Sequence, residues 1–98
     1  RNIKLFCAAG MSTSMLVAYE AAAADQGYEV EIAAHAVAEA SKLGGDADFI
    51  LLGPPVRFEV DRVKALFPDK PVEAIDTVMY GTMNGVGVIN HVREVLGD

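Results

Sequence analysis

Four short strand-like segments, each followed by a stretch of helical periodicity, are the feature that most constrains the fold of this chain. The strand-like segments are residues 3–7, 28–35, 49–52 and 71–75. Parallel strands need long crossover connections, which are usually helices and are almost always right-handed. The alternation therefore predicts an α/β fold, in which a parallel sheet carries helices on both of its faces.

Two of these segments differ in their hydrophobic pattern. Residues 28–35 begin as an alternation of apolar side chains with the acidic Glu29 and Glu31, which is typical of a strand with one wet side, as at a sheet edge. Residues 49–52 are continuously apolar, which indicates a strand that is covered on both faces. We therefore expect only the first of the two to be partly exposed to water.

Caps and glycines mark the ends of the predicted helices. Ser12 or Thr13 can cap a first helix that continues from Met15 until Gly27 ends it. The other predicted elements are helices at 37–43 and 56–67, a short turn at 77–80 that Asp76 can cap, and a last helix from about Asn84 that buries Val88, Ile89, Val92 and Leu96.

Length and charge exclude several classes of function. A chain of 98 residues buries about 60–70% of the surface that its unfolded form exposes, so we expect residues 1–98 to form a single domain. The net charge is −6 and no basic cluster occurs, which disfavours nucleic acids as partners. No apolar run approaches the ~20 residues of a membrane span and no leader precedes the first strand, so we expect no direct membrane insertion.

The cysteine content also limits the chemistry. Cys7 is the single cysteine, and with two widely separated histidines it offers no zinc-ligand spacing, so we expect neither a metal nor a cofactor. One cysteine forms no internal disulfide, and a reduced, cytoplasmic setting is the default for such a chain.

Cys7 stands at the junction between the first strand and the first helix, and ligands of α/β sheets bind beyond the carboxyl ends of the strands. Consecutive backbone N–H groups and a helix start bind a dianionic phosphate, and the field of a helix N-terminus lowers the pKa of a thiol. The pattern favours a phosphorylated cysteine over a merely buried one. The loop predicted to surround the phosphate consists of Ala8, Ala9, Gly10, Met11, Ser12, Thr13 and Ser14.

Two other functions use a similar loop. A low-molecular-weight tyrosine phosphatase has the form Cys-x5-Arg, but Thr13 stands at the arginine position, no Lys or Arg occurs between Lys4 and Lys42, and no Asp-Pro dipeptide supplies a general acid. A non-catalytic phosphate-sensing module would bind phosphate without forming a covalent adduct. Nucleotide binding is disfavoured because no Lys follows Gly10.

The chain resembles the IIB component of the phosphoenolpyruvate-dependent sugar phosphotransferase system, in its lactose, cellobiose and chitobiose family. The resemblance implies a three-layer fold with a four-stranded parallel sheet of order 2-1-3-4. It also implies a cytoplasmic phosphocarrier that takes phosphate from a phosphohistidine of a IIA component and passes it to a β-linked disaccharide imported by a membrane IIC component. The resemblance covers essentially the whole chain and is carried by residues 3–7, 9–14, 47–54, 70–76 and 80–81.

Carried over residue by residue, the resemblance makes Cys7 the phosphorylated nucleophile and residues 8–14 the loop whose amides surround the phosphate. Met11 is the residue of this loop that we expect to contact IIA. Pro55 departs from the family pattern, which often has Gln after the Gly-Pro pair, and this removes a side-chain donor near the site.

Four further residues are side candidates. His35 follows the second strand and would raise the thiolate fraction of Cys7 if it lay beside it, but a surface histidine is the favoured interpretation. His91 receives no role. Asp76 and Tyr80 belong to the family pattern and are explained by a helix cap and a packed ring.

Overall fold

The fold is an α/β sandwich around one parallel sheet. In the computed structural model, which describes residues 1–8 and 13–98 and only the backbone of 13–15, the described residues form a four-stranded sheet of order β2-β1-β3-β4. All neighbouring strands are parallel, which confirms the predicted fold class and strand order. The strands are β1 (Asn2–Cys7), β2 (Glu31–Ala36), β3 (Phe49–Leu52) and β4 (Val72–Ala74).

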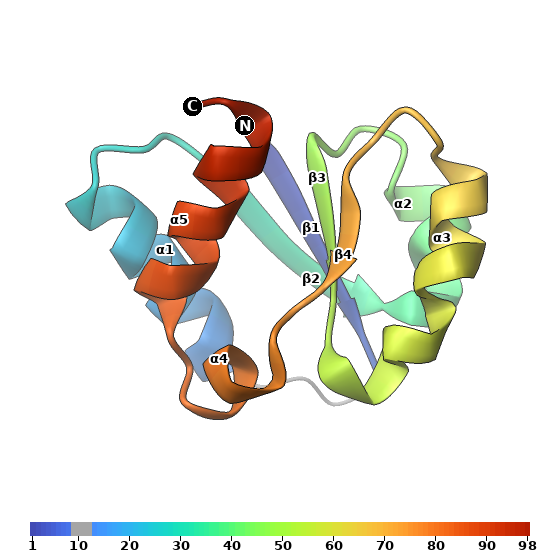
Figure 1. The fold of residues 1–98 in the computed structure, drawn as a ribbon, viewed down its shortest axis with the longest axis horizontal. Helices are drawn as coiled ribbons and strands as arrows, with labels where there is room; N and C mark the ends of the chain where they lie inside the picture. Colours follow the sequence, from blue (N-terminus) through green and yellow to red (C-terminus); the bar gives the residue numbers. More distant parts are fainter. Residues whose placement is uncertain (9–12) are drawn as a thin grey trace.

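Helices cover both faces of the sheet, so the described residues form three layers (Figure 1). The helices on one face are α1 (Thr13–Asp25), α4 (Thr77–Gly81) and α5 (Gly85–Leu96). The helical segments on the other face are the 3-10 helix η1 (Val37–Glu39), α2 (Ala40–Leu43), the 3-10 helix η2 (Pro54–Glu59) and α3 (Val60–Leu66).

Each face of the sheet has its own core cluster, because successive side chains of a strand point to opposite faces. Ile3 and Leu5 of β1 pack with Tyr19, Ile89 and Val92 of α1 and α5, among others. The second cluster, on the face of α2 and α3, includes Phe6, Ala40, Ile50, Leu52, Val63 and Val72. Burying one large apolar side chain stabilises the fold by about 1.5–3 kcal/mol, so the two clusters hold β1 and β3 from both sides.

The edge strand β2 is shorter at its start than the predicted 28–35. Its pairing begins where the Glu31 N–H donates to the Arg1 carbonyl at 2.8 Å, so residues 28–30 precede the ladder. Val30 and Ile32 nevertheless pack toward the α1 and α5 cluster, as the alternation predicted. The edge position is confirmed, and the boundary was wrong because it depends on where β1 offers partners.

The region predicted as one helix at 56–67 contains two segments. Pro54 begins η2, and Val56 has φ −116° and ψ 20°, a kink that separates the first turn from the second. The regular helix α3 begins only at Val60. A proline is tolerated in the first turn of a helix, where its missing N–H costs no hydrogen bond, and 3-10 turns are frequent at the start of α-helices.

One predicted cap, one predicted helix start and one predicted stop are confirmed. Asp76 accepts hydrogen bonds from the N–H groups of Val78 and Met79, and Asn84, at the start of α5, accepts one from Gly87. Gly27 follows α1 with φ +65°, the left-handed conformation that a glycine adopts without strain. At its start, α1 already includes Thr13, so Thr13 is not the residue that caps it, and Ser12, the other predicted cap, lies outside the described residues. None of the described helices has both the length and the apolar content that crossing a membrane requires.

Candidate functional site

The carboxyl ends of three strands meet at the place where Cys7 ends β1. The Gly53 N–H, just after β3, donates to the Phe6 carbonyl at 2.9 Å, and the Ile75 N–H, just after β4, donates to the Leu52 carbonyl at 2.8 Å. The short helix α4 starts directly beyond β4 and lies at this same end of the sheet (Figure 1). Residues from β1, β3 and α4 are therefore brought together at one edge.

The Cys7 side chain is buried and lies on the face of α1, α4 and α5. Its position in β1 has the same parity as Ile3 and Leu5, which pack in the cluster on that face. Only 4% of the residue is exposed. The sulfur lies 3.3 Å from the hydroxyl oxygen of Tyr80, a hydrogen bond in which either group can donate when Cys7 is a thiol.

Gly53 leaves the space that this contact occupies. A Cβ atom at position 53 would lie 2.7 Å from the Cys7 sulfur and 3.4 Å from Cε1 of the Tyr80 ring. The first distance is shorter than side-chain contacts allow, so any other residue at position 53 would displace the sulfur. The backbone of Gly53 has φ −65° and ψ 149°, which any residue adopts, so the need for glycine is one of space.

Tyr80 is held in its protonated form. Its hydrogen bond with Cys7, followed by its partial burial, raises the pKa of the Tyr80 phenol to about 12. At neutral pH the phenol therefore keeps its proton, and it is the donor whenever Cys7 is a thiolate. The prediction of a packed ring was incomplete, because the ring also delivers a hydroxyl to the sulfur.

Most of the predicted phosphate loop lies outside the described residues. Ala8 is exposed and follows β1, and α1 begins at Thr13, so a strand end and a helix start flank the segment as predicted. The loop residues outside the described part are Ala9, Gly10, Met11 and Ser12, together with the side chains of Thr13 and Ser14. The amide cradle therefore stays a prediction.

His35 does not share a face with Cys7. It pairs with Phe6 in the sheet, and the two rings lie against each other with their centroids 6.1 Å apart, whereas Cys7 pairs with Ala36. Phe6 belongs to the cluster on the α2 and α3 face, opposite to the Cys7 side chain. This geometry argues against His35 as a neighbour of the thiol, and the residue is half-buried against Phe6 instead of lying fully at the surface.

His91, which received no role, lies at the edge of the sheet. Its Nε2 is 2.6 Å from Oε1 of Glu73 on β4, and both side chains are partly exposed. They border a hollow of about 300 Å³ between β4 and α5 that is also lined by Asp76 and Met79.

Pro55, which departs from the family pattern, is exposed. No group of side chains suited to a metal ion occurs among the described residues.

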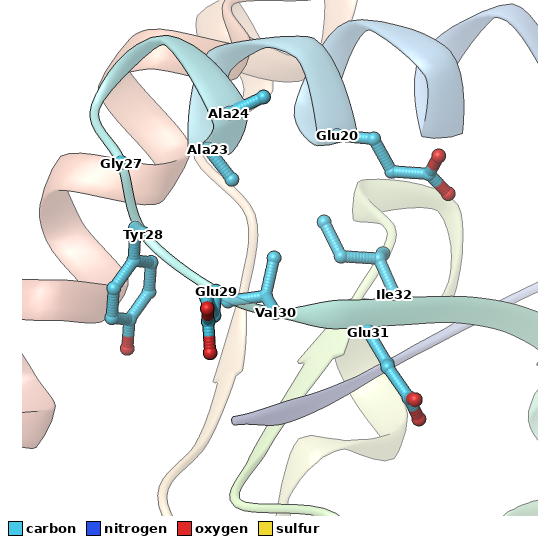
Figure 2. A pocket seen from close by; sticks show the side chains of 9 residues that line it. All are labelled: Glu20, Ala23, Ala24, Gly27, Tyr28, Glu29, Val30, Glu31 and Ile32. Atoms are coloured by element: carbon cyan, nitrogen blue, oxygen red, sulfur yellow. The ribbon is translucent and has the colours of Figure 1, made fainter.

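A hollow of about 830 Å³ lies at the opposite end of the sheet, between α1 and the start of β2. Val30 and Ile32 point toward α1 in it, whereas Glu29 and Glu31, which line it as well, point away from α1, and Glu20 borders it on α1 (Figure 2). Glu31 pairs with Asn2 at the amino end of β1, far along the sheet from Cys7. Three carboxylates repel phosphate, so this hollow does not suit a phosphoryl group.

Comparisons with known proteins agree on one family. The family described as the lactose/cellobiose-specific IIB subunit of the PTS system matches residues 2–91. The cellobiose-specific EIIB component of Lactococcus lactis subsp. lactis (strain IL1403) is 42% identical over 95 residues, covering 89% of this chain and 88% of that protein. The galactose-specific EIIB component of Lactococcus lactis subsp. cremoris (strain MG1363) is 41% identical with the same coverage.

Two solved structures share the fold. The cellobiose-specific IIB component of Borrelia burgdorferi has a TM-score of 0.72 at 41% identity, covering 91% of this chain and 84% of that chain. The lactose-specific IIB domain of Streptococcus pneumoniae has a TM-score of 0.81 at 19% identity, covering 95% of this chain and 94% of that chain, which is a likeness of fold. Sequence match and fold together confirm the resemblance, and the chain belongs to the lactose/cellobiose-specific IIB family of the phosphotransferase system.

Proposed function

We propose that this IIB chain is a phosphocarrier in which the Cys7 thiolate accepts a phosphoryl group from a phosphohistidine of a IIA component. The observation that carries the proposal is the place of Cys7, at the carboxyl end of an inner strand and a few residues before α1. A helix start and consecutive amides favour a phosphate at this junction, and each hydrogen bond to a charged group contributes about 1.5–3 kcal/mol. Residues 8–14 supply these amides in the proposal.

The reaction consists of two in-line displacements at phosphorus. In the first, the Cys7 sulfur forms a bond to phosphorus while the bond from phosphorus to the histidine nitrogen breaks, and the imidazole keeps the electron pair. In the second, a sugar hydroxyl oxygen forms a bond to the same phosphorus and releases its proton to water, while the bond from phosphorus to sulfur breaks and Cys7 leaves as a thiolate. The chain ends the cycle as it began.

The second acceptor is proposed to be a β-linked disaccharide that enters through a membrane IIC component. The family is described as lactose/cellobiose-specific and two of the relatives are named for cellobiose, which supports this sugar class, whereas a third is named for galactose, a monosaccharide. The sugar site belongs to IIC in this proposal. Residues 1–98 act as a single domain in the cytoplasm, where both IIA and the cytoplasmic side of IIC are accessible.

The experiment that tests the proposal is intact mass spectrometry after incubation with phosphoenolpyruvate, the general phosphotransferase proteins and a matched IIA. We expect one added phosphoryl group on the wild-type chain and none on Cys7→Ser or on protein alkylated at Cys7. The Cys7→Ser variant should keep its free energy of unfolding within about 1 kcal/mol, because the replacement is nearly isosteric.

An unmodified mass with an active IIA would contradict the carrier, and so would full phosphorylation of Cys7→Ser. Steady release of phosphate from an aryl phosphate would instead indicate a hydrolase. Binding of inorganic phosphate without a covalent adduct would indicate a sensing module.

A further inference from the structure

We propose that Tyr80 is a second functional residue of this site, whose hydroxyl donates a hydrogen bond to the Cys7 thiolate and so holds and stabilises the sulfur as nucleophile and as leaving group. This inference rests on the proposed function for its role in catalysis. The contact itself does not depend on that function, because the structure shows it directly: Tyr80 Oη lies 3.3 Å from Cys7 Sγ.

The backbone on both sides of Tyr80 is anchored. The Tyr80 N–H donates to the carbonyl of Asp76 at 2.9 Å, and the Tyr80 carbonyl accepts from the N–H of Met83 at 3.2 Å. Two positions on either side of Tyr80, the Thr82 hydroxyl donates to the Val78 carbonyl at 2.7 Å. The five-residue helix α4 thus presents the ring from a fixed position, although it is short.

The ring is also fixed by packing. Tyr80 packs, partly buried, against the cluster of α1 and α5, and its Cε1 lies next to the position that a Cβ on Gly53 would occupy. The aromatic body therefore fills space beside the core, while only its hydroxyl reaches the sulfur. These two roles can be separated, since a phenylalanine keeps the ring and removes the hydroxyl.

At neutral pH, Tyr80 can only donate its hydrogen bond to the Cys7 thiolate. The phenol keeps its proton, because its hydrogen bond with Cys7 and its burial raise the pKa of Tyr80 to about 12. It therefore acts as a donor and not as a base. A hydrogen bond to the charged form of a group favours that form, so the phenol stabilises the free thiolate and the thiolate that departs when the bond from sulfur to phosphorus breaks.

The test is the pH profile of Cys7 alkylation by iodoacetamide, followed by intact mass, in the wild type, Tyr80→Phe and Tyr28→Phe. Tyr28→Phe is the matched control, because it also loses one hydroxyl and one hydrogen bond, to Asp98. We expect the midpoint of the Tyr80→Phe profile to move up by about one pH unit, with about tenfold slower alkylation at neutral pH. The Tyr28→Phe profile should coincide with that of the wild type.

A Tyr80→Phe profile that coincides with the wild type would overturn the inference, as would an equal shift in Tyr28→Phe. A second measurement needs no variant. In the wild type, alkylation of Cys7 should lower the pH at which one of the three tyrosines, Tyr80, ionises. Ultraviolet absorbance measures this ionisation. An unchanged tyrosine titration would contradict the hydrogen bond.

The catalytic part has its own readout. The phosphorylated form of Tyr80→Phe should transfer its phosphoryl group to a sugar with IIC about tenfold more slowly than the wild type, because the leaving thiolate has lost its donor. If the wild type itself takes no phosphoryl group, the proposed function fails, whereas the alkylation profile still decides whether Tyr80 stabilises the thiolate. Equal discharge rates would remove Tyr80 from the reaction.

Discussion

The three tyrosines of this chain have the same side chain in three different situations. The Tyr19 hydroxyl is buried and has no hydrogen-bond partner among the described residues, and burial raises the pKa of Tyr19 to about 12. The Tyr28 hydroxyl donates to Asp98, and the Tyr80 hydroxyl contacts the Cys7 sulfur. Residue type alone therefore does not identify the tyrosine proposed to be functional. The partner of its hydroxyl identifies it.

Gly53→Ala tests the space around the sulfur. The added Cβ would lie 2.7 Å from Cys7 Sγ, so we expect a loss of about 1–3 kcal/mol in the free energy of unfolding from overpacking. We also expect slower alkylation of Cys7, because the sulfur is displaced from Tyr80. Both are measured on one protein sample, by urea unfolding and by the iodoacetamide rate.

The matched control for this change is Gly45→Ala, since a Cβ at position 45 would meet nothing within 4 Å. Its free energy of unfolding should change by less than about 1 kcal/mol, with unchanged alkylation. Equal effects of the two substitutions would contradict the steric role of Gly53.

At the scale of elements, α4 is the part of the described structure that completes the site. Its five residues are too short to be stable as an isolated helix, so caps and flanking contacts maintain it. Asp76 accepts from the N–H groups of Val78 and Met79 at 2.9 and 3.1 Å. The cap therefore determines where Tyr80 is presented, one turn later.

Asp76→Ala should cost about 0.5–2 kcal/mol in the free energy of unfolding and should also shift the pH profile of Cys7 alkylation upward, toward that of Tyr80→Phe. The reason is that the loss of the cap loosens α4 and with it the Tyr80 hydroxyl. Urea unfolding and the alkylation profile measure the two effects.

Asn84→Ala is the control, because Asn84 caps α5 in the same manner, accepting from the Gly87 N–H at 3.0 Å. It should lose similar stability with an unchanged alkylation profile. A profile that stays unchanged in Asp76→Ala as well would show that α4 holds Tyr80 without its cap.

On the scale of the whole molecule, the proposed site at Cys7 and the contact between the two ends of the described chain lie at opposite ends of the sheet. The two ends of the described chain lie side by side at the amino edge of the strands (Figure 1). The Arg1 side chain donates two hydrogen bonds of 2.8 Å to Asp98, which also accepts from Tyr28. The guanidinium of Arg93 lies 5.1 Å from the centre of the Tyr28 ring. This closure cluster of Arg1, Tyr28, Arg93 and Asp98 joins β1, the entry to β2 and the end of α5 away from Cys7.

The closure cluster predicts a pH dependence of stability. The Arg1 and Tyr28 hydrogen bonds lower the pKa of Asp98 from 3.8 to about 2. A carboxyl with a lowered folded-state pKa adds stability above its unfolded pKa and loses it as the pH falls through the folded one. The melting temperatures of the wild type and Asp98→Asn should therefore differ at pH 6 and converge between about pH 4 and pH 2.

Thermal unfolding at several pH values measures this convergence. Glu20→Gln serves as the control, because the Glu20 side chain is exposed and forms no ion pair among the described residues. Its difference from the wild type should be small at every pH. A constant difference between the wild type and Asp98→Asn down to pH 2 would contradict the role of the carboxylate.

The sequence by itself determined the elements that depend on local pattern. The alternation of strands and helices, the wet edge strand, the Asp76 cap, the helix start at Asn84 and the Gly27 stop all follow from periodicity and capping chemistry, and the structure has them. Cys7 became the proposed nucleophile because a lone cysteine precedes a loop of small and hydroxyl residues. The strand order came from the family resemblance, since periodicity does not specify which strands are neighbours.

Only the tertiary structure decided what surrounds the sulfur. Tyr80 is 73 positions away from Cys7, and Gly53 follows a different strand, so no local pattern links either of them to the thiol. Parallel pairing of β1, β3 and β4 sets their carboxyl ends at one edge, and the Asp76 cap then directs α4 across it. The same alternation of side chains places His35 on the opposite face, which depends on strand register and not on distance along the chain.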